Sequence, residues 1–488
     1  MSIPRVLLGG LLAASIALIA YVMTHYGVPA GMAIAILPLG LCLLWFSLNS
    51  MVVSMFLMFI VNFYIMALGR YVHNFPIGTL LDLVIFYNIL LLTFQALVHK
   101  IEWRNLGSGL TIASLIWLVY CSLELVNPET VSTKGWFINI RSVALYMFFI
   151  TALTQLTLTK FKYLKYMLVI LSVLTLTAVI KACIQKYFGF NAAENYWLFV
   201  DGGQTTHIIY TGIRYFSFFS DAANFGGCMG LSMVILSISA LYYRNPWMKV
   251  YLLLVAAAAC YGMLISGTRS ALAVPFVGYA VFAVLSGSWK ISLFSGIAII
   301  MAVLFLNFTT IGQSNAIIRR ARSAFNTQDA SFQVRLQNQE KLRALMVDKP
   351  FGGGIGHGGG KAKAFAPNAP LTQIPTDSWF VMIWVETGIV GILLHLSVLL
   401  YILGWGAYQV LFRLKNVRVR GFTTALIAGI SGIVVMSYAN EVLGQIPIGP
   451  ILYMGMAFIF LSPRFDREVT ETEAKEAAAL AAHTAQFY

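Results

Sequence analysis

The most constraining feature of this sequence is a succession of long apolar runs separated by short polar connections. Each run is close to the length, roughly 20 residues, that a helix needs to cross a bilayer. The apolar residues are continuous within the runs, whereas the strands of a membrane β-barrel would alternate. The sequence therefore predicts an all-α polytopic membrane protein with about 14 (12–14) transmembrane helices. The fourteen runs lie at 6–24, 31–48, 50–68, 77–98, 108–124, 140–158, 163–184, 222–242, 248–267, 270–287, 290–308, 379–411, 421–440 and 447–463.

Composition supports a membrane protein and excludes a water-soluble enzyme. Of the 488 residues, 59% are hydrophobic and 10% are charged, whereas a soluble domain carries about 25% charged residues. The net charge of +14 then indicates contact with anionic lipid head groups or phosphorylated substrates, and no nucleic acid. The five cysteines lie in apolar runs without metal-ligand spacing, so neither a disulfide nor a metal site is expected.

The basic residues predict the orientation of the chain. With a cytoplasmic N-terminus, 16 Lys and Arg fall on the inner side and 7 on the outer side, apart from the long segment 309–377. Because inner loops are enriched in these residues, both termini are predicted to be cytoplasmic. The expected division is helices 1–11 in 1–308, a large periplasmic loop in 309–377, helices 12–14 in 378–463, and a cytoplasmic tail helix in 464–488, where Thr470 and Glu473 would form a capping box.

The twelfth run is longer than a bilayer is thick and contains two unusual residues, Glu386 and Gly388. It is therefore expected to begin as a short half-helix before the true span. A carboxylate at membrane depth needs a cationic or hydrogen-bonding partner, so Glu386 is a candidate binding residue, with the outer arginines as possible partners.

Two arginines lie at the outer ends of spans. Arg214 stands among aromatic residues, and its planar guanidinium suits a phosphate; the alternative is an interfacial arginine stacked on Tyr215 or Phe218. Arg269 follows Gly267 in a break too short for an ordinary loop, so a guanidinium and a helix N-terminus coincide. Both arginines are predicted to bind an anion in one outer-facing cavity.

Asp221 and Asn224 precede the helix that follows Arg214. Asp221 is a good N-cap residue, and Asn224 lies one turn further on. Substrate binding and helix capping both explain these residues.

The segment 309–377 combines a net charge of +5 with a predicted helix at 331–346 and the glycine-rich segment, residues 350–360. Glycine-rich backbone can cradle an anion through its N–H groups. His357 within it is a candidate general base, or else a histidine of a flexible loop. Asp377 is a second candidate catalyst, or else the N-cap of the following helix.

The order of these motifs resembles the O-antigen ligase and O-antigen polymerase superfamily over residues 210–392. The resemblance is carried by Arg214 with Asp221 and Asn224, by Ser-Gly-Thr-Arg-Ser at 266–270, by Asp329, Ser331 and Arg335, by Pro-Phe-Gly at 350–352, and by Trp-Val-Glu-Thr-Gly-Ile-Val-Gly at 384–391.

This resemblance implies a metal-independent membrane glycosyltransferase without a cofactor, facing the periplasm from the bacterial inner membrane. It implies transfer of a glycan from undecaprenyl pyrophosphate to a glycan or lipid acceptor, with Arg214 and Arg269 holding the pyrophosphate and Arg335 also at the site. Ligases carry a His-Asn pair where this chain has Asp377 and Ser378. That difference favours the polymerase branch, with Asp377 as the base and His357 as the alternative.

Four other functions are to be weighed against this one. The same motifs serve O-antigen ligases and protein O-oligosaccharide ligases. A transporter or flippase for lipid-linked glycans is the non-enzyme alternative, but such proteins are usually built from repeats, and no convincing repeat is present. A purely structural scaffold does not explain the arginines at the outer ends of spans.

Overall fold

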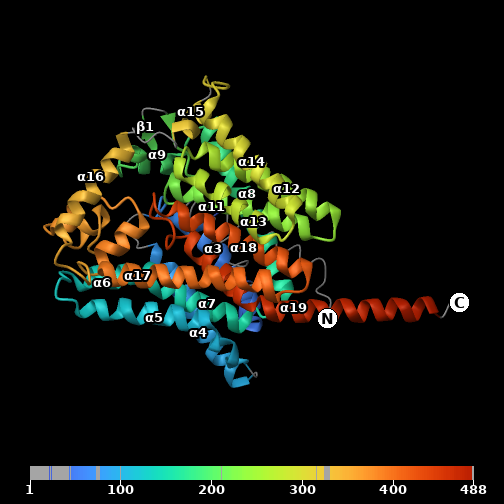
Figure 1. Cartoon of the computed structure of the whole chain (residues 1–488). Helices are drawn as coiled ribbons and strands as arrows, with labels where there is room; N and C mark the ends of the chain where they lie inside the picture. Colours follow the sequence, from blue (N-terminus) through green and yellow to red (C-terminus); the bar gives the residue numbers. More distant parts are fainter. Residues whose placement is uncertain are drawn as a thin grey trace.

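The structure is a computed structural model that describes residues 21, 24, 43, 45–72, 77–98, 101–209, 212–314, 316–323 and 330–485. Helices dominate this part of the chain (Figure 1). The first half contains α3 Met51–Leu68, α4 Gly78–Val98, η1 Trp103–Gly107, α5 Gly109–Leu123, η2 Glu124–Val126, α6 Thr133–Ile140, η3 Arg141–Leu145, α7 Tyr146–Thr157, α8 Phe161–Tyr187, α9 Ala192–Phe199, α10 Gln204–His207, β1 Ile208–Ile209, β2 Gly212–Ile213 and α11 Ala222–Tyr242.

The second half contains α12 Pro246–Ile265, η4 Arg269–Leu272, α13 Ala273–Leu285, α14 Trp289–Phe308, α15 Ala316–Ser323, α16 Ala330–Leu345, η5 Gly360–Ala364, η6 Pro370–Gln373, α17 Trp379–Tyr408, η7 Gln409–Arg413, α18 Val417–Met436 and α19 Ile448–Ala485. The two short strands pair antiparallel, with Ile208 opposite Ile213 and Ile209 opposite Gly212.

Ten helices in the described residues are long and apolar enough to cross a membrane, and 269–285 and 292–308 are shorter apolar helices. The chain is a multi-pass membrane protein. Each predicted apolar run from 50–68 onward coincides with one of these helices. The runs at 6–24 and 31–48 lie almost wholly outside the described residues, so the total of 12–14 spans stays a prediction.

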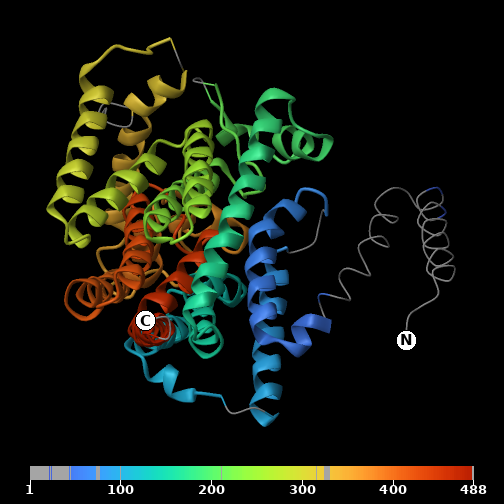
Figure 2. The same cartoon turned by 90° about the vertical axis from the view of Figure 1, so that its right-hand side faces the viewer.

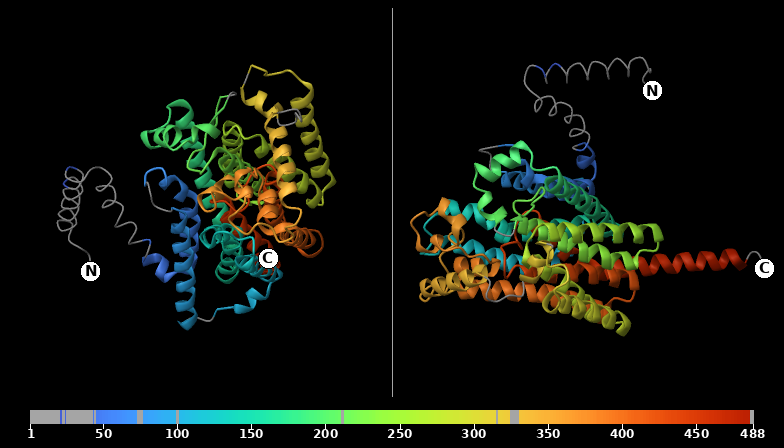
Figure 3. Two further views of the ribbon diagram at one scale, coloured as in Figure 1. Left: turned by 90° about the vertical axis from the view of Figure 1, so that its left-hand side faces the viewer. Right: turned by 90° about the horizontal axis from the view of Figure 1, so that it is seen from above.

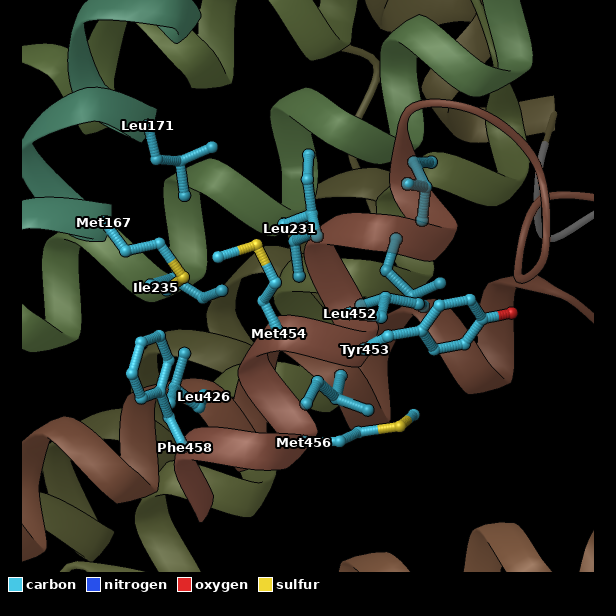
Figure 4. Packing of buried hydrophobic residues seen from close by; sticks show 14 of the residues in the cluster. Met167, Leu171, Leu231, Ile235, Leu426, Leu452, Tyr453, Met454, Met456 and Phe458 are labelled. Carbon is cyan, nitrogen blue, oxygen red and sulfur yellow. The ribbon is translucent and has the colours of Figure 1, made fainter. Parts of the chain in front are cut away.

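The centre of the bundle is formed by α11, by α18 and by the part of α19 before Thr470, where most side chains are buried. Figure 4 shows Leu231 and Ile235 of α11 packed near Met454 of α19. Small residues allow this close approach: a Cβ on Gly429 would lie 2.6 Å from the Ile235 side chain. Membrane helices associate through such contacts because lipid offers no hydrophobic driving force between them.

The helix α17 is broken at Gly388, whose φ of 68° and ψ of −170° are not helical. The expectation of a half-helix ahead of the true span is therefore confirmed. The break exposes backbone groups that must be satisfied within the protein. Tyr120 donates its hydroxyl to the Thr387 carbonyl at 2.7 Å, and Val390 N–H donates to the Pro350 carbonyl at 3.3 Å.

The helix α19 runs without interruption from Ile448 to Ala485, so the separate tail helix expected to start at a Thr470 capping box is wrong. A proline leaves the carbonyl four residues before it without its helical donor. Here the Ser462 hydroxyl donates to the Ile459 carbonyl at 2.7 Å, which lets the helix continue through Pro463. Glu473 instead accepts hydrogen bonds from Arg244, in the connection between α11 and α12, and from Arg418, in the first turn of α18, at 2.7 and 2.6 Å.

The polar segments gather at one end of the bundle. Figure 1 shows α9, β1 and α16 at the end opposite to the projecting C-terminal part of α19. Figure 2 views the bundle from the side of the C-terminus. The left view of Figure 3, from the other side, shows the orange segment around 350–377 in front of the helices. The candidate residues of the sequence therefore share one end of the molecule.

Candidate functional site

The arginine turn, residues Ser266–Ser270, connects α12 to η4. Gly267 has a φ of 61°, the left-handed region that glycine enters without strain. The Ser266 hydroxyl accepts a hydrogen bond from the Thr268 N–H at 3.2 Å and donates to the Met263 carbonyl at 2.7 Å. This internal bonding fixes the turn that presents Arg269.

Arg214 lies against this turn, although 55 positions separate it from Arg269. Its Nη2 donates to the Thr268 hydroxyl at 2.8 Å, and Thr268 in turn donates to the Ala222 carbonyl at 2.9 Å. Its Nη1 donates to the Thr206 carbonyl at 3.1 Å, while the buried Nε has no hydrogen-bond partner among the described residues. The structure thus brings the two arginines to the same turn, and Arg214 makes no ring contact with Tyr215 or Phe218 in the described chain.

The electrostatics of Arg214 reflect an excess of positive charge. Burial is the main factor that lowers its pKa, and the charges of Arg269, Arg320 and Arg335 lower it further. Asp221 is the carboxylate that opposes this shift. We call Arg214, Arg269, Arg320 and Arg335 the arginine cluster. Like charges held together in this way favour binding of an anion with more than one negative charge.

Asp221 and Asn224 take part in local structure, although the buried Oδ1 of Asn224 has no hydrogen-bond partner among the described residues. Asp221 is the N-cap of α11, and its Oδ1 accepts the N–H groups of Ala223 and Asn224, each at 2.8 Å. The Asn224 amide donates to the Ile446 carbonyl at 2.6 Å and to the Ser220 hydroxyl at 3.1 Å. The capping explanation therefore accounts for Asp221, and Asn224 ties α11 to the segment before α19.

The glycine-rich segment wraps around the broken start of α17 and binds Glu386. The Oε1 of Glu386 accepts the N–H groups of Gly356 and Gly358 at 3.0 and 3.2 Å, and the residue is 2% exposed. Gly353 N–H donates to the Val385 carbonyl at 2.8 Å. The backbone N–H groups do bind an anion, as the sequence predicts, but this anion is the Glu386 carboxylate of the protein itself. The proposed pairing of Glu386 with an outer arginine is replaced by these backbone contacts.

His357 is buried, with 1% exposure, and both ring nitrogens have partners. Its Nε2 accepts the Ser132 N–H at 2.9 Å, so the neutral ring carries its proton on Nδ1, which faces the Gly354 and Ile355 carbonyls at 3.3 and 3.2 Å. Burial lowers the pKa of His357, in keeping with a neutral ring. These contacts explain His357 as a structural residue that joins the glycine-rich segment to the start of α6.

Asp377 is placed differently. It is exposed, its φ of 51° is unusual for a residue other than glycine, and its carboxylate makes no hydrogen bond within the described residues. Ser378, rather than Asp377, is the N-cap of α17, since its hydroxyl accepts the Val381 N–H at 3.4 Å. The capping explanation for Asp377 is therefore wrong. A strained and unengaged carboxylate at the surface of the site is available for chemistry.

Charged neighbours surround Asp377. Desolvation by the surrounding protein raises its pKa, Glu441 adds to this effect, and Arg335 and Lys361 oppose it. Glu441 holds this region together, because it accepts hydrogen bonds from the Thr376 hydroxyl and from Lys361 Nζ, the latter at 2.9 Å. Arg335 acts electrostatically on both Asp377 and Arg214. The arginine cluster and the Asp377 carboxylate therefore belong to one charged region.

Sequence reasoning missed three residues of this region: Glu441, Lys361 and Arg320. Glu441 directly follows the predicted apolar run 421–440. In the structure α18 ends at Met436, and residues 437–441 form a loop at the same end as the arginine turn. The pair Asn440-Glu441 at the end of an apolar run was the available signal. No comparable signal singled out Lys361 or Arg320 among the basic residues of 309–377.

The comparison with known families bears on these residues. The family model described as O-antigen ligase matches residues 252–396. This segment is similar to the O-antigen ligase family. The match confirms the resemblance to the O-antigen ligase and polymerase superfamily, whose members are membrane enzymes. No curated protein matches the chain.

The O-antigen ligase match includes the arginine turn, the glycine-rich segment, α16 and the first part of α17. Arg214 and Glu441 lie outside it and are brought to it by the fold, through Thr268 and Thr376. The match to this family implies lipid-linked glycan and acceptor substrates only in general terms. The described residues contain no group of three or more His, Cys, Asp or Glu suited to a metal.

Proposed function

We propose that this protein is a polymerase-like glycosyltransferase that moves a glycan from undecaprenyl pyrophosphate to a sugar hydroxyl, on the periplasmic face of the bacterial inner membrane. The observation that carries the proposal is the hydrogen bond from Arg214 to Thr268, which unites Arg214 with the turn that bears Arg269. A pair of guanidinium groups at the outer end of spanning helices suits the diphosphate of a membrane lipid.

In the proposed reaction the acceptor oxygen attacks the anomeric carbon of the donor glycan. A new C–O bond forms, the bond between that carbon and the phosphate oxygen breaks, and the lipid diphosphate leaves with the electron pair. The arginine cluster stabilises the negative charge that grows on the diphosphate. The Asp377 carboxylate accepts the proton of the acceptor hydroxyl. We assign no metal or cofactor to this reaction.

Asp377 is preferred over His357 as the base. The His357 nitrogens are occupied by backbone groups, and transferring a proton to Nε2 would require the loss of the contact with Ser132. Asp377 has no such commitments within the described residues and lies next to the rigid start of α17. The raised pKa of Asp377 also makes it a better base than an ordinary aspartate.

A ligase that transfers the glycan to lipid A core or to a protein hydroxyl is the alternative, and the description of the matching family favours it. The same arginine turn and the same base would serve either acceptor. A transporter or flippase would bind the lipid-linked glycan without changing it.

The test uses the purified full chain in lipid nanodiscs, supplied with a lipid-linked oligosaccharide. Longer lipid-linked glycans are the expected product. Glycan on an added lipid A core or peptide acceptor would support the ligase instead. Unchanged oligosaccharide with each acceptor, in preparations that still bind it, would contradict both enzymes and favour the transporter.

A further inference from the structure

The short helix α15 places one of its three arginines on the arginine turn. The Nη1 of Arg320 donates to the Ile213 carbonyl at 3.3 Å, in the strand that leads directly to Arg214. Three residues further along α15, the Ser323 hydroxyl lies 3.4 Å from Nη1 of Arg269. The helix thus contacts Arg269 and the residue directly before Arg214, and Arg214 and Arg269 are the two arginines that hold the donor in the proposed function.

Two glycines leave the space that Arg320 occupies. A Cβ on Gly267 would lie 2.3 Å from Nη1 of Arg320 and 3.3 Å from Cγ of Arg214. A Cβ on Gly212 would lie 3.2 Å from Nη2 of Arg320. Both glycines have positive φ values, of 61° and 115°, so the backbone there also favours the absence of a side chain. The two arginine side chains therefore meet directly above the turn.

The other arginines of α15 point elsewhere. Arg319 donates to the Gln313 and Ser314 carbonyls at 2.8 and 2.9 Å, and Arg322 donates to the Ile311 carbonyl at 2.8 Å. Both side chains therefore stabilise the connection between α14 and α15, because they donate hydrogen bonds to its backbone carbonyl groups. Only Arg320 of this trio is turned toward the arginine turn.

A small cavity lies between α15 and the turn, lined by Gly267, Thr268, Arg269 and Arg320 and by apolar side chains that include Met263 and Leu264. Two of these side chains are guanidinium groups, and Arg214 reaches the same turn from the other side. The charge of Arg320 lowers the pKa of Arg214, which means that the two positive charges repel each other in the absence of an anion. A ligand with several negative charges would relieve this repulsion.

We infer that Arg320 is a third guanidinium of the donor site and that it makes the site selective for a lipid diphosphate over a lipid monophosphate. This inference rests on the proposed function, because it assigns Arg320 to the same donor site as Arg214 and Arg269. A diphosphate carries more negative charge than a monophosphate and spreads its terminal oxygen atoms over a longer distance, so it is better matched to three guanidinium groups that approach from different elements. The matched segment includes Arg320 but does not by itself assign it a role.

The experiment measures binding, so it does not depend on turnover. The purified full chain in nanodiscs is titrated with undecaprenyl diphosphate and, separately, with undecaprenyl monophosphate. The variants are Arg320→Gln, Arg320→Lys, Arg214→Gln and the matched control Arg319→Gln, which removes an equal charge from the same helix. Apparent melting temperature and gel filtration establish that each variant is folded.

The unaltered chain and Arg319→Gln should both prefer the diphosphate. Arg320→Gln should weaken diphosphate binding about tenfold or more, the size expected for one charge-assisted contact, and leave monophosphate binding nearly unchanged. Arg320→Lys should recover part of the loss, because it restores charge without the planar fork.

Equal diphosphate binding by Arg320→Gln and Arg319→Gln, with a loss in Arg214→Gln, would overturn the role of Arg320 and leave the proposed function intact. Failure of the unaltered chain to bind the diphosphate would instead contradict the proposed function. An equal loss of diphosphate and monophosphate binding in Arg320→Gln would overturn the claim of selectivity.

Discussion

The sequence predicts an anion site at both the arginine turn and the glycine-rich segment. In the structure, a carboxylate of the protein itself occupies the glycine-rich segment. Around the glycine-rich segment, the backbone N–H groups of Gly356 and Gly358 already bind the Glu386 carboxylate. Around the arginine turn, positive side chains gather, and Asp221, the carboxylate that acts on Arg214 among the described residues, is occupied as a helix cap. Backbone N–H groups that already bind a carboxylate of the protein indicate a structural role. Several positive side chains gathered at one turn indicate a site for a negatively charged ligand.

The candidate bases Asp377 and His357 give the largest expected difference between the two regions. Asp377→Asn should lower turnover by about 10²–10⁴-fold with little change in donor binding, because the amide cannot accept the proton at neutral pH. Asparagine tolerates a positive φ, so the variant should fold. Glycan transfer and donor binding are measured on the same nanodisc preparation.

His357→Ala should act mainly on stability, because it leaves the Ser132 N–H without its acceptor. The folded fraction of this variant should retain most of its turnover. If His357→Ala is folded but inactive, and Asp377→Asn is active, the assignments of the two regions must be exchanged.

The next largest loss in the rate of transfer is expected when a guanidinium group is removed from the arginine turn. Arg269→Gln should lower the rate of transfer by about 10²–10³-fold, the range found when one preorganised donor to a developing anion is removed. Arg104→Gln, at the opposite end of the bundle, removes the same charge and should leave the rate unchanged. A similar small effect of both variants would mean that the positive surplus at the turn serves no reaction.

The sequence could predict most of the helices but not which polar residues were already satisfied. Apolar runs locate spans because lipid demands continuous helices, and the break at Gly388 was predictable from a run that is too long and contains Glu386. The partners of Glu386 come from thirty residues away along the chain. Contacts of that kind depend on how the glycine-rich segment packs against α17, and this packing cannot be predicted from the spacing of residues in the sequence.

Arg70 illustrates the same limit. In the sequence it resembles Arg214, since both are arginines next to the outer ends of apolar runs. In the structure Arg70 is 4% exposed, donates to the Ser217 and Phe219 carbonyls, and lies over the Trp197 ring at 4.9 Å. Its two hydrogen bonds hold the segment that follows Arg214, and its ring contact joins that segment to α9. Tertiary contacts separate a structural arginine from a ligand-binding one.

A smaller effect is expected when Glu386 is substituted. Because Glu386 belongs to the glycine-rich region with internal partners, its substitution should change the stability of the protein rather than the rate of transfer. Glu386→Ala removes the acceptor of two buried N–H groups, at a cost of about 1–3 kcal/mol for each. Glu386→Gln keeps an acceptor oxygen for these two N–H groups. Its amide nitrogen would replace Oε2, which has no hydrogen-bond partner in the described chain, so this variant should be tolerated. Apparent melting temperatures measure both effects. A fully stable Glu386→Gln protein that has lost donor binding would show that Glu386 belongs to the ligand site.

The smallest expected effect is a displacement of the pH profile, and it tests whether Asp377 is the titrating base. The rate should fall as the pH is lowered through the pKa of Asp377, which lies above its ordinary value because desolvation and Glu441 outweigh Arg335 and Lys361. Glu441→Gln removes a negative charge, so the carboxylate loses its proton more readily and the acidic limb should move to lower pH. Arg335→Gln removes a positive charge, so the same limb should move to higher pH.

The direction of these shifts is informative even where the variants also lower the maximal rate, because the midpoint of the limb does not depend on its height. The two substitutions remove charges of opposite sign near one carboxylate, so a nonspecific disturbance of the fold would not shift the midpoint in opposite directions. Profiles of donor turnover at saturating acceptor are compared for the unaltered chain and the two variants. Shifts of the same sign, or a limb that persists in Asp377→Asn, would show that another group titrates and that Asp377 is not the base.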